Sequence, residues 1–121
     1  MTGIGGVFFP AKDPEALSAW YAEHLGVPAP PTDYGGEVWT QAAGATVFAP
    51  MPAGSPFFTP GSKLWINFRV DDLQALCDEL ERSGIPVERD GEEYPNGVFA
   101  SLLDPEGNQI QLWEPRGVGL H

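Results

Sequence analysis

The chain repeats its own pattern once, and this internal repeat is the strongest constraint on how it can fold. Residues 9–17 (FPAKDPEAL) resemble residues 68–76 (FRVDDLQAL) at an offset of 59 positions. Each copy then runs into a glycine, Gly26 or Gly84. Two copies fill the chain, which is typical of a duplicated domain, because a solenoid needs more repeats. We expect one α+β domain over residues 1–121, with module 1 at about 1–55 and module 2 at about 62–121.

Each unit carries the start and stop signals of a helix. Asp13 is a good N-cap, Pro14 suits the first helical position, and Gly26 ends the pattern. In the second unit Asp71 or Asp72 begins the helix and Gly84 closes it. These signals predict helices near residues 13–25 and 72–83. The second helix includes Cys77 on its apolar stripe, where a cysteine is expected to be an inert core residue.

Strand patterns surround both helices. Residues 65–70 alternate, with Ile66, Phe68 and Val70 on one face and Trp65, Asn67 and Arg69 on the other. The first module is expected to open the same way, with Phe9 facing its helix and Phe8 facing the opposite side. Further strands are predicted at residues 37–41, 45–49, 87–89, 98–103 and 109–113. Residues 104–107 (DPEG) form a strong turn signal before the last of these strands.

A proline-rich segment joins the two units. Residues 50–62 hold Pro50, Pro52, Pro56 and Pro60. Phe57 and Phe58 also lie in this segment, and exposed aromatic pairs of this kind usually meet another surface. We expect this segment to cover a pocket or an oligomer interface.

Charge and composition exclude several classes of function. The formal net charge is −11, and no basic stripe interrupts it, so we expect no nucleic-acid partner and no anionic membrane surface. Apolar stretches are broken by Pro and Gly before they reach the length of a membrane span. No export signal is visible at the N-terminus. Because Cys77 is the only cysteine, no internal disulfide can form, and a cytoplasmic location is expected.

Together these features resemble the vicinal oxygen chelate superfamily, which includes glyoxalase I, extradiol dioxygenases and bleomycin-resistance proteins. The resemblance rests on a strand leading into DPEAL at 13–17, on Leu25-Gly26, and on DPEGN at 104–108 before a strand ending LWEP at 112–115. It implies two βαβββ modules that form a curved mixed sheet and cup a pocket. It also implies a homodimer, which the apolar linker at 50–62 favours as well.

The resemblance also implies where a catalytic metal would be bound, and this chain departs from that pattern. In metal-using members a histidine opens the first strand of a module, and those positions here hold Gly6 and Trp65. The acidic ligand of the last strand is replaced by Gln111, whose neutral amide is a poorer ligand than a carboxylate. Only His24 and His121 remain as histidines. We therefore expect no metal, no cofactor and no catalytic residue.

Strand alternation predicts what the cup contains instead. Aromatic rings and amides, with one cation, suit a flat ligand that is held by stacking and oriented by hydrogen bonds. The acidic chain also favours a cationic ligand, because its field attracts positive charge. The candidate ligand-binding residues that this alternation places in the cup are Phe8, Trp65, Asn67, Arg69, Gln109, Gln111 and Trp113. Tyr34 and Trp39 are added as an extension of its wall, with their facing left open.

Three functions follow from this pattern. The first is a metal-free small-molecule-binding protein of the glyoxalase/bleomycin-resistance type, whose ligand is planar or cationic. The second is a metal-dependent lyase or dioxygenase of the same superfamily, with its ligands displaced to other positions or supplied by a partner chain. The third, a subunit that acts only through protein contacts, applies if the aromatic side chains fill the cup. We favour the first, and therefore a binding protein in preference to an enzyme.

Overall fold

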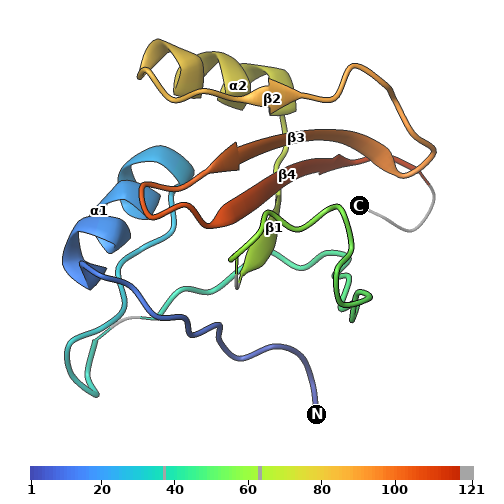
Figure 1. Cartoon of the computed structure of the whole chain (residues 1–121). Coiled ribbons are helices and arrows are strands. Elements are labelled where there is room, and N and C mark those ends of the chain that lie inside the picture. Colours follow the sequence, from blue (N-terminus) through green and yellow to red (C-terminus); the bar gives the residue numbers. More distant parts are fainter. Residues whose placement is uncertain (37, 63, 118–121) are drawn as a thin grey trace.

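A four-stranded mixed sheet forms the centre of the fold (Figure 1). The computed structural model describes residues 1–36, 38–62 and 64–117. The strands lie in the order β1-β4-β3-β2, with β1 parallel to β4 and the other pairs antiparallel. Their bounds are Trp65–Arg69 for β1, Glu88–Arg89 for β2, Gly97–Leu103 for β3 and Gln109–Pro115 for β4. The prediction of an α+β fold with a curved mixed sheet is confirmed.

Both helices begin and end where the sequence signals placed them. Helix α1 spans Pro14–Leu25, the Asp13 side chain accepts a hydrogen bond from the Ala16 amide, and Gly26 adopts the left-handed conformation. Helix α2 spans Leu73–Arg82, and its N-cap is Asp72. In each case a side-chain oxygen satisfies a backbone N–H that the first turn leaves without a partner. None of the helices in the described residues is long and apolar enough to cross a membrane.

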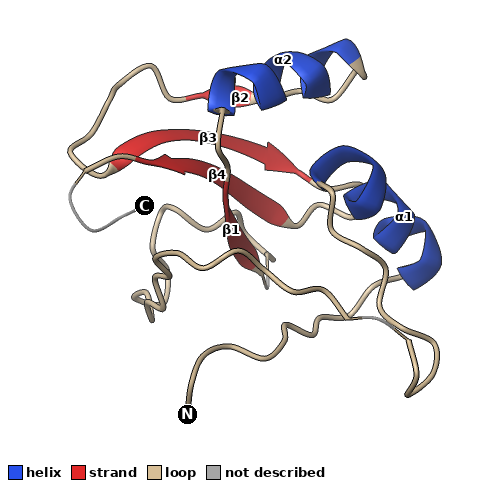
Figure 2. Ribbon diagram, turned by 180° about the vertical axis from the view of Figure 1, so that it is seen from behind, coloured by secondary structure: helices blue, strands red, loops and turns tan. Residues whose placement is uncertain are grey.

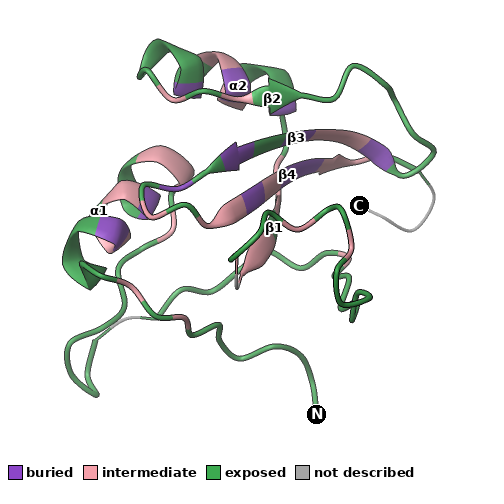
Figure 3. Cartoon of the chain, viewed as in Figure 1, coloured by how far each residue is buried: buried purple, intermediate pink, exposed green. Residues whose placement is uncertain are grey.

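The core lies between the two helices and one face of the sheet. Figure 3 shows buried residues concentrated on α1, α2, β3 and β4. Leu80, Ile110 and Leu112 are almost completely shielded from water. Cys77 belongs to this cluster, and its burial raises the pKa of the thiol. The predicted role of Cys77 as a core residue therefore agrees with its place in the fold.

The first half of the chain contains no strand among its described residues, which corrects the sequence-based expectation. Residues 6–11, 38–41 and 45–49 alternate like strands, yet they run as irregular chain beyond β1, at the opposite end of the molecule from α2 (Figure 2). Glu37 lies outside the described residues. A strand forms only where a sheet edge pairs with its backbone, and no edge pairs with these segments here. The division into two modules, at about 1–55 and 62–121, stays a prediction.

Candidate functional site

The sheet has a second face, turned away from the helices, and this face carries most of the predicted site. Strand pairing aligns Trp65, Asn67 and Arg69 of β1 with residues 109, 111 and 113 of β4. The same β4 residues pair with residues 103, 101 and 99 of β3. We call this surface the open face; it consists of Trp65, Asn67, Arg69, Phe99, Ser101, Leu103, Gln109, Gln111 and Trp113.

An amide pair lies at the middle of the open face. Asn67 Nδ2 donates a hydrogen bond of 2.8 Å to Gln111 Oε1, which joins β1 to β4 through their side chains. Asn67 Oδ1 and Gln111 Nε2 have no hydrogen-bond partner within the described part of the chain. The pair therefore presents one acceptor and one donor to a ligand, which is the arrangement that fixes the orientation of a flat polar molecule.

The Trp65 end of the open face is covered by the proline-rich linker. Phe58 meets the Trp65 ring edge-on at 5.4 Å between centroids, and Phe57 stacks on it at 6.4 Å. The Gln109 amide accepts a hydrogen bond from the Thr59 amide at 2.8 Å and donates one to the Phe57 carbonyl at 2.9 Å. The hydrogen-bonding capacity of Gln109 is therefore largely used in holding the linker, and this end is less available to a ligand.

The other end of the open face is built from three aromatic rings. Phe99 and Trp113 lie parallel, with 6.2 Å between ring centroids, and Tyr94 meets Phe99 edge-on at 5.9 Å. Trp113 is only 4 % exposed, and its indole N–H donates to the Asn96 carbonyl at 2.9 Å. Gly97 permits this arrangement, because a Cβ there would lie 2.9 Å from the indole nitrogen and 2.2 Å from the Glu114 carbonyl oxygen. Trp113 thus supports Phe99 and presents little surface of its own.

A depression of about 400 Å³ opens beside these rings. This volume lies near the lower end of the range of small-molecule sites, about 300–1,000 Å³, and the depression is wide open to solvent. The Tyr94 hydroxyl donates to Asp90 Oδ2 at 2.9 Å, and this hydrogen bond raises the pKa of the phenol. The lining residues are Asp90, Tyr94, Pro95, Asn96, Phe99 and Gln111.

Arg69 contributes a cation at the β1 side of the open face. Its Nη2 donates to the Ala42 carbonyl at 3.1 Å. Gly44 lies so close to the guanidinium that a Cβ at that position would collide with Nη1. The segment around residues 42–44 is therefore attached to the sheet through Arg69. Within the described residues this guanidinium forms no ion pair with a carboxylate.

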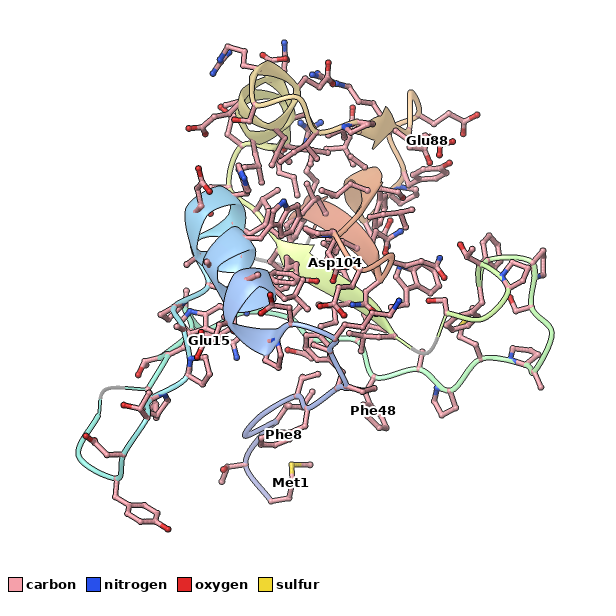
Figure 4. All side chains as sticks on the ribbon, turned by 60° about the vertical axis from the view of Figure 1, so that its left-hand side comes forward. Met1, Phe8, Glu15, Phe48, Glu88 and Asp104 are labelled. Atoms are coloured by element: carbon pink, nitrogen blue, oxygen red, sulfur yellow. The ribbon has the colours of Figure 1, made fainter. Side chains whose placement is uncertain are left out.

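Three of the predicted site residues lie away from the open face. Phe8 is 96 % exposed, Trp39 is 46 % exposed, and Tyr34 is fully exposed. Figure 4 shows Phe8 on the N-terminal segment, apart from the sheet. The structure brings together Trp65, Asn67, Arg69, Gln109, Gln111 and Trp113 and leaves these three outside. For Phe8 and Trp39 the predicted place depends on strands of the first module, which the described residues do not form.

Sequence reasoning missed Tyr94, Phe99 and Asp90. The alternation of residues 97–103 contained the signal for Phe99, because Val98, Ala100 and Leu102 face the helices and leave Phe99, Ser101 and Leu103 on the open face. Asp90 and Tyr94 lie in the connection between β2 and β3, where no alternation of apolar and polar residues predicts the side of the sheet on which a residue lies.

The donors on the open face do not fit a divalent metal. Gln111 Oε1 is already engaged by Asn67, and the Trp65 side chain is packed against Phe57 and Phe58. Across the described residues no group of three or more His, Cys, Asp or Glu side chains converges. The indole of Trp65 and the amide of Gln111 are themselves poor ligands for divalent transition metals.

Comparison with known proteins agrees with the fold. The sequence matches the model of a glyoxalase-like domain over residues 6–113. No curated protein matches the chain significantly. TnmS3, an antibiotic-binding protein from Streptomyces sp. CB03234, is 25% identical, with 88% of this chain and 90% of that chain covered and a TM-score of 0.54.

Two further solved structures are similar. A glyoxalase/bleomycin resistance protein from the same Streptomyces is 25% identical, covering 87% of this chain and 94% of the other, with a TM-score of 0.52. Lactoylglutathione lyase from Agrobacterium tumefaciens is 20% identical over 94% of both chains, with a TM-score of 0.61, and shares the fold. The chain therefore belongs to the glyoxalase-like domain family of the vicinal oxygen chelate superfamily.

Proposed function

We propose that this protein binds a planar organic small molecule on the open face and does so without a catalytic metal. The observation that carries the proposal is the depression between Tyr94, Phe99 and Gln111, where aromatic surface lies next to an amide with a free donor. Stacking holds the ligand, and the amides set its orientation. The similarity to TnmS3, an antibiotic-binding protein, supports the same function. The net charge of −11 adds a general attraction for positively charged ligands.

A titration of intrinsic tryptophan fluorescence with a panel of planar compounds tests the proposal. Binding should quench or shift the emission, because Trp113 lies directly beside Phe99. Phe99→Ala should weaken binding by about tenfold, which corresponds to the loss of one stacked ring and its buried area. Phe48→Ala is the matched control, since Phe48 is exposed on the outlying segment (Figure 4). Equal losses in the two variants would contradict a site at Phe99.

Metal analysis of the purified protein separates binding from the enzymatic alternative. A lyase or dioxygenase with displaced ligands requires a stoichiometric transition metal that survives dialysis. We expect no such metal, because the open face offers indole and amide groups in place of histidine and carboxylate. Retention of a stoichiometric metal would favour the enzyme.

We also propose that the protein forms a homodimer. The chain exposes 9009 Å² of surface, whereas a compact monomer of 13.0 kDa exposes roughly 6,300 Å². The surplus exceeds the roughly 800 Å² per partner of a standard stable interface. Much of it is apolar and lies in the first half of the chain, as at Ile4, Phe8, Trp39 and Phe48. Sedimentation that shows only a 13.0 kDa species at micromolar concentration would contradict this proposal.

The lone Cys77 is consistent with the cytoplasm, where thiols stay reduced, and we retain that location as part of the proposal.

A further inference from the structure

One row of side chains crosses the open face from a cation to an anion. Arg69 on β1 is paired with Trp113 on β4, and Trp113 is paired with Phe99 on β3. Asp90 follows β2, and its amide donates to the Phe99 carbonyl at 3.1 Å. The row therefore runs Arg69, Trp113, Phe99, Asp90 and spans three steps between strands, which is about 14 Å.

The two charged ends of this row are not neutralised by other charges. Arg89 and Arg116 each bind two carboxylates, whereas Arg69 uses one of its five N–H donors on the Ala42 carbonyl and pairs with no carboxylate in the described chain. Asp90 is exposed and accepts from the Tyr94 hydroxyl and the Glu92 amide, and no described cation pairs with it. Arg69 can therefore bind a further anionic or hydrogen-bond-accepting group, and Asp90 can bind a further cationic or hydrogen-bond-donating group.

The space between these ends is aromatic. Phe99 and Tyr94 supply its accessible ring surface, and Trp113, which is nearly fully buried, lies parallel to Phe99 and supports it, so a flat molecule lying across the strands stacks on Phe99 and Tyr94. The amide pair Asn67–Gln111 lies one pleat away, on the same face of the sheet. A ligand with a positive charge alone would satisfy Asp90 but would place no partner on Arg69, and unpaired charge beside a ligand is unfavourable.

We propose that the natural ligand is a flat, dipolar molecule, with an acidic group at Arg69 and a basic nitrogen at Asp90 and Tyr94. This inference rests on the proposed binding function and specifies the ligand class of the same site. Charge-assisted hydrogen bonds form at both ends, and stacking occurs between them. The negative net charge of the protein accelerates the approach of the cationic end of the ligand. Arg69 then fixes the orientation of the bound ligand.

The test is a calorimetric titration of the full chain with four tricyclic probes of one shape: acridone, an aminoacridine, an acridine carboxylate, and an aminoacridine carboxylate. We expect the aminoacridine carboxylate to bind at least about tenfold more tightly than acridone. Arg69→Met should weaken both carboxylate probes by about tenfold and leave the other two within about twofold. Asp90→Asn should weaken the two amino probes by about tenfold and leave acridone and the acridine carboxylate within about twofold.

Controls separate recognition from loss of structure. Arg82→Met and Glu79→Gln change the net charge by the same amount at exposed positions on α2 and should leave all four affinities unchanged. Arg69→Lys keeps the positive charge and should lose less affinity for carboxylates than Arg69→Met. If Arg69→Met weakens all four probes equally, Arg69 only supports the segment at 42–44 and the inference is overturned.

The remaining outcomes are also decisive. If acridone binds as tightly as the aminoacridine carboxylate, the site recognises planar surface alone; the proposed function then stands and the dipolar ligand is rejected. If none of the four probes binds, the proposed function fails and the inference fails with it.

Discussion

The Tyr21 hydroxyl donates a hydrogen bond of 2.7 Å to Asp104 Oδ2, although the two residues lie 83 positions apart. Asp104 is 5 % exposed, and its carboxylate also accepts from the amides of Glu106 and Asn108 and from the Asn108 side chain. Burial, and then the adjacent carboxylate, raise the pKa of Tyr21 far above its usual value. This contact attaches α1 to the turn between β3 and β4.

Tyr21→Phe should destabilise the protein by roughly 1.5–3 kcal/mol, because it removes a donor from a buried, charged acceptor. Chemical denaturation at neutral pH measures the loss. Tyr34→Phe, which changes a fully exposed hydroxyl, is the control and should leave the free energy of unfolding unchanged. If the two variants were equally stable, the contact between α1 and the turn would not contribute to the fold.

Both helices and much of the second half of the fold follow from local sequence signals. Asp13 and Asp72 cap their helices, and the alternation of residues 65–69 and 109–113 places the correct side chains on each face. Asp104 and Gly107 form the predicted turn, with a 3.0 Å hydrogen bond between their backbones. These features depend on neighbours in the chain or on a period of two, and both can be read from one sequence.

The segments around α1 in the first half of the chain could not be predicted in the same way. Residues 45–49 alternate as a strand does, but a strand also needs an edge with which to pair, and that edge is a property of the whole fold. For the same reason Phe8 and Trp39 lie outside the open face, while Tyr34 lies in a turn, where no alternation predicts a facing. Asp90 and Tyr94 enter the site through the path of an irregular connection, which no local pattern encodes.

Glu114 should make stability depend on pH at the acid end. It accepts a hydrogen bond from the Leu73 amide at the start of α2 and binds Arg116, and these contacts, in that order, lower its pKa below 4.5. A carboxyl group whose pKa is lower in the folded chain than in the unfolded chain stabilises the fold at pH values above its unfolded-state pKa. This stabilisation is lost as the pH falls through the folded-state pKa.

We therefore expect Glu114→Gln to be less stable than the natural chain at pH 7, by roughly 1–2 kcal/mol, because the charge-assisted hydrogen bonds are lost. The difference should shrink as the pH falls below 4.5. Urea denaturation across this range checks it, with Glu79→Gln on the exposed side of α2 as control. A constant difference at every pH would contradict the role given to the ionised carboxylate.

The two tryptophans of the open face should respond differently to removal. Trp113→Ala leaves a cavity at a nearly fully buried position and should cost roughly 3–5 kcal/mol of folding stability. Trp65 is half-buried beneath the linker, so Trp65→Ala should cost only roughly 1–2 kcal/mol and release Phe57 and Phe58. Thermal unfolding of the two variants decides the order, and the reverse order would mean that the linker, rather than Trp113, is the main support of this face.

The most direct test of the central claim is an NMR titration of the isotope-labelled chain with an aminoacridine carboxylate. If a flat ligand binds on the open face, backbone amide shifts should concentrate at residues 90–101 and at 109–113, around Phe99 and Gln111. The exposed side of α2 should stay unchanged. Shifts confined to the helices, or a spectrum that does not change at millimolar ligand, would contradict binding at this site.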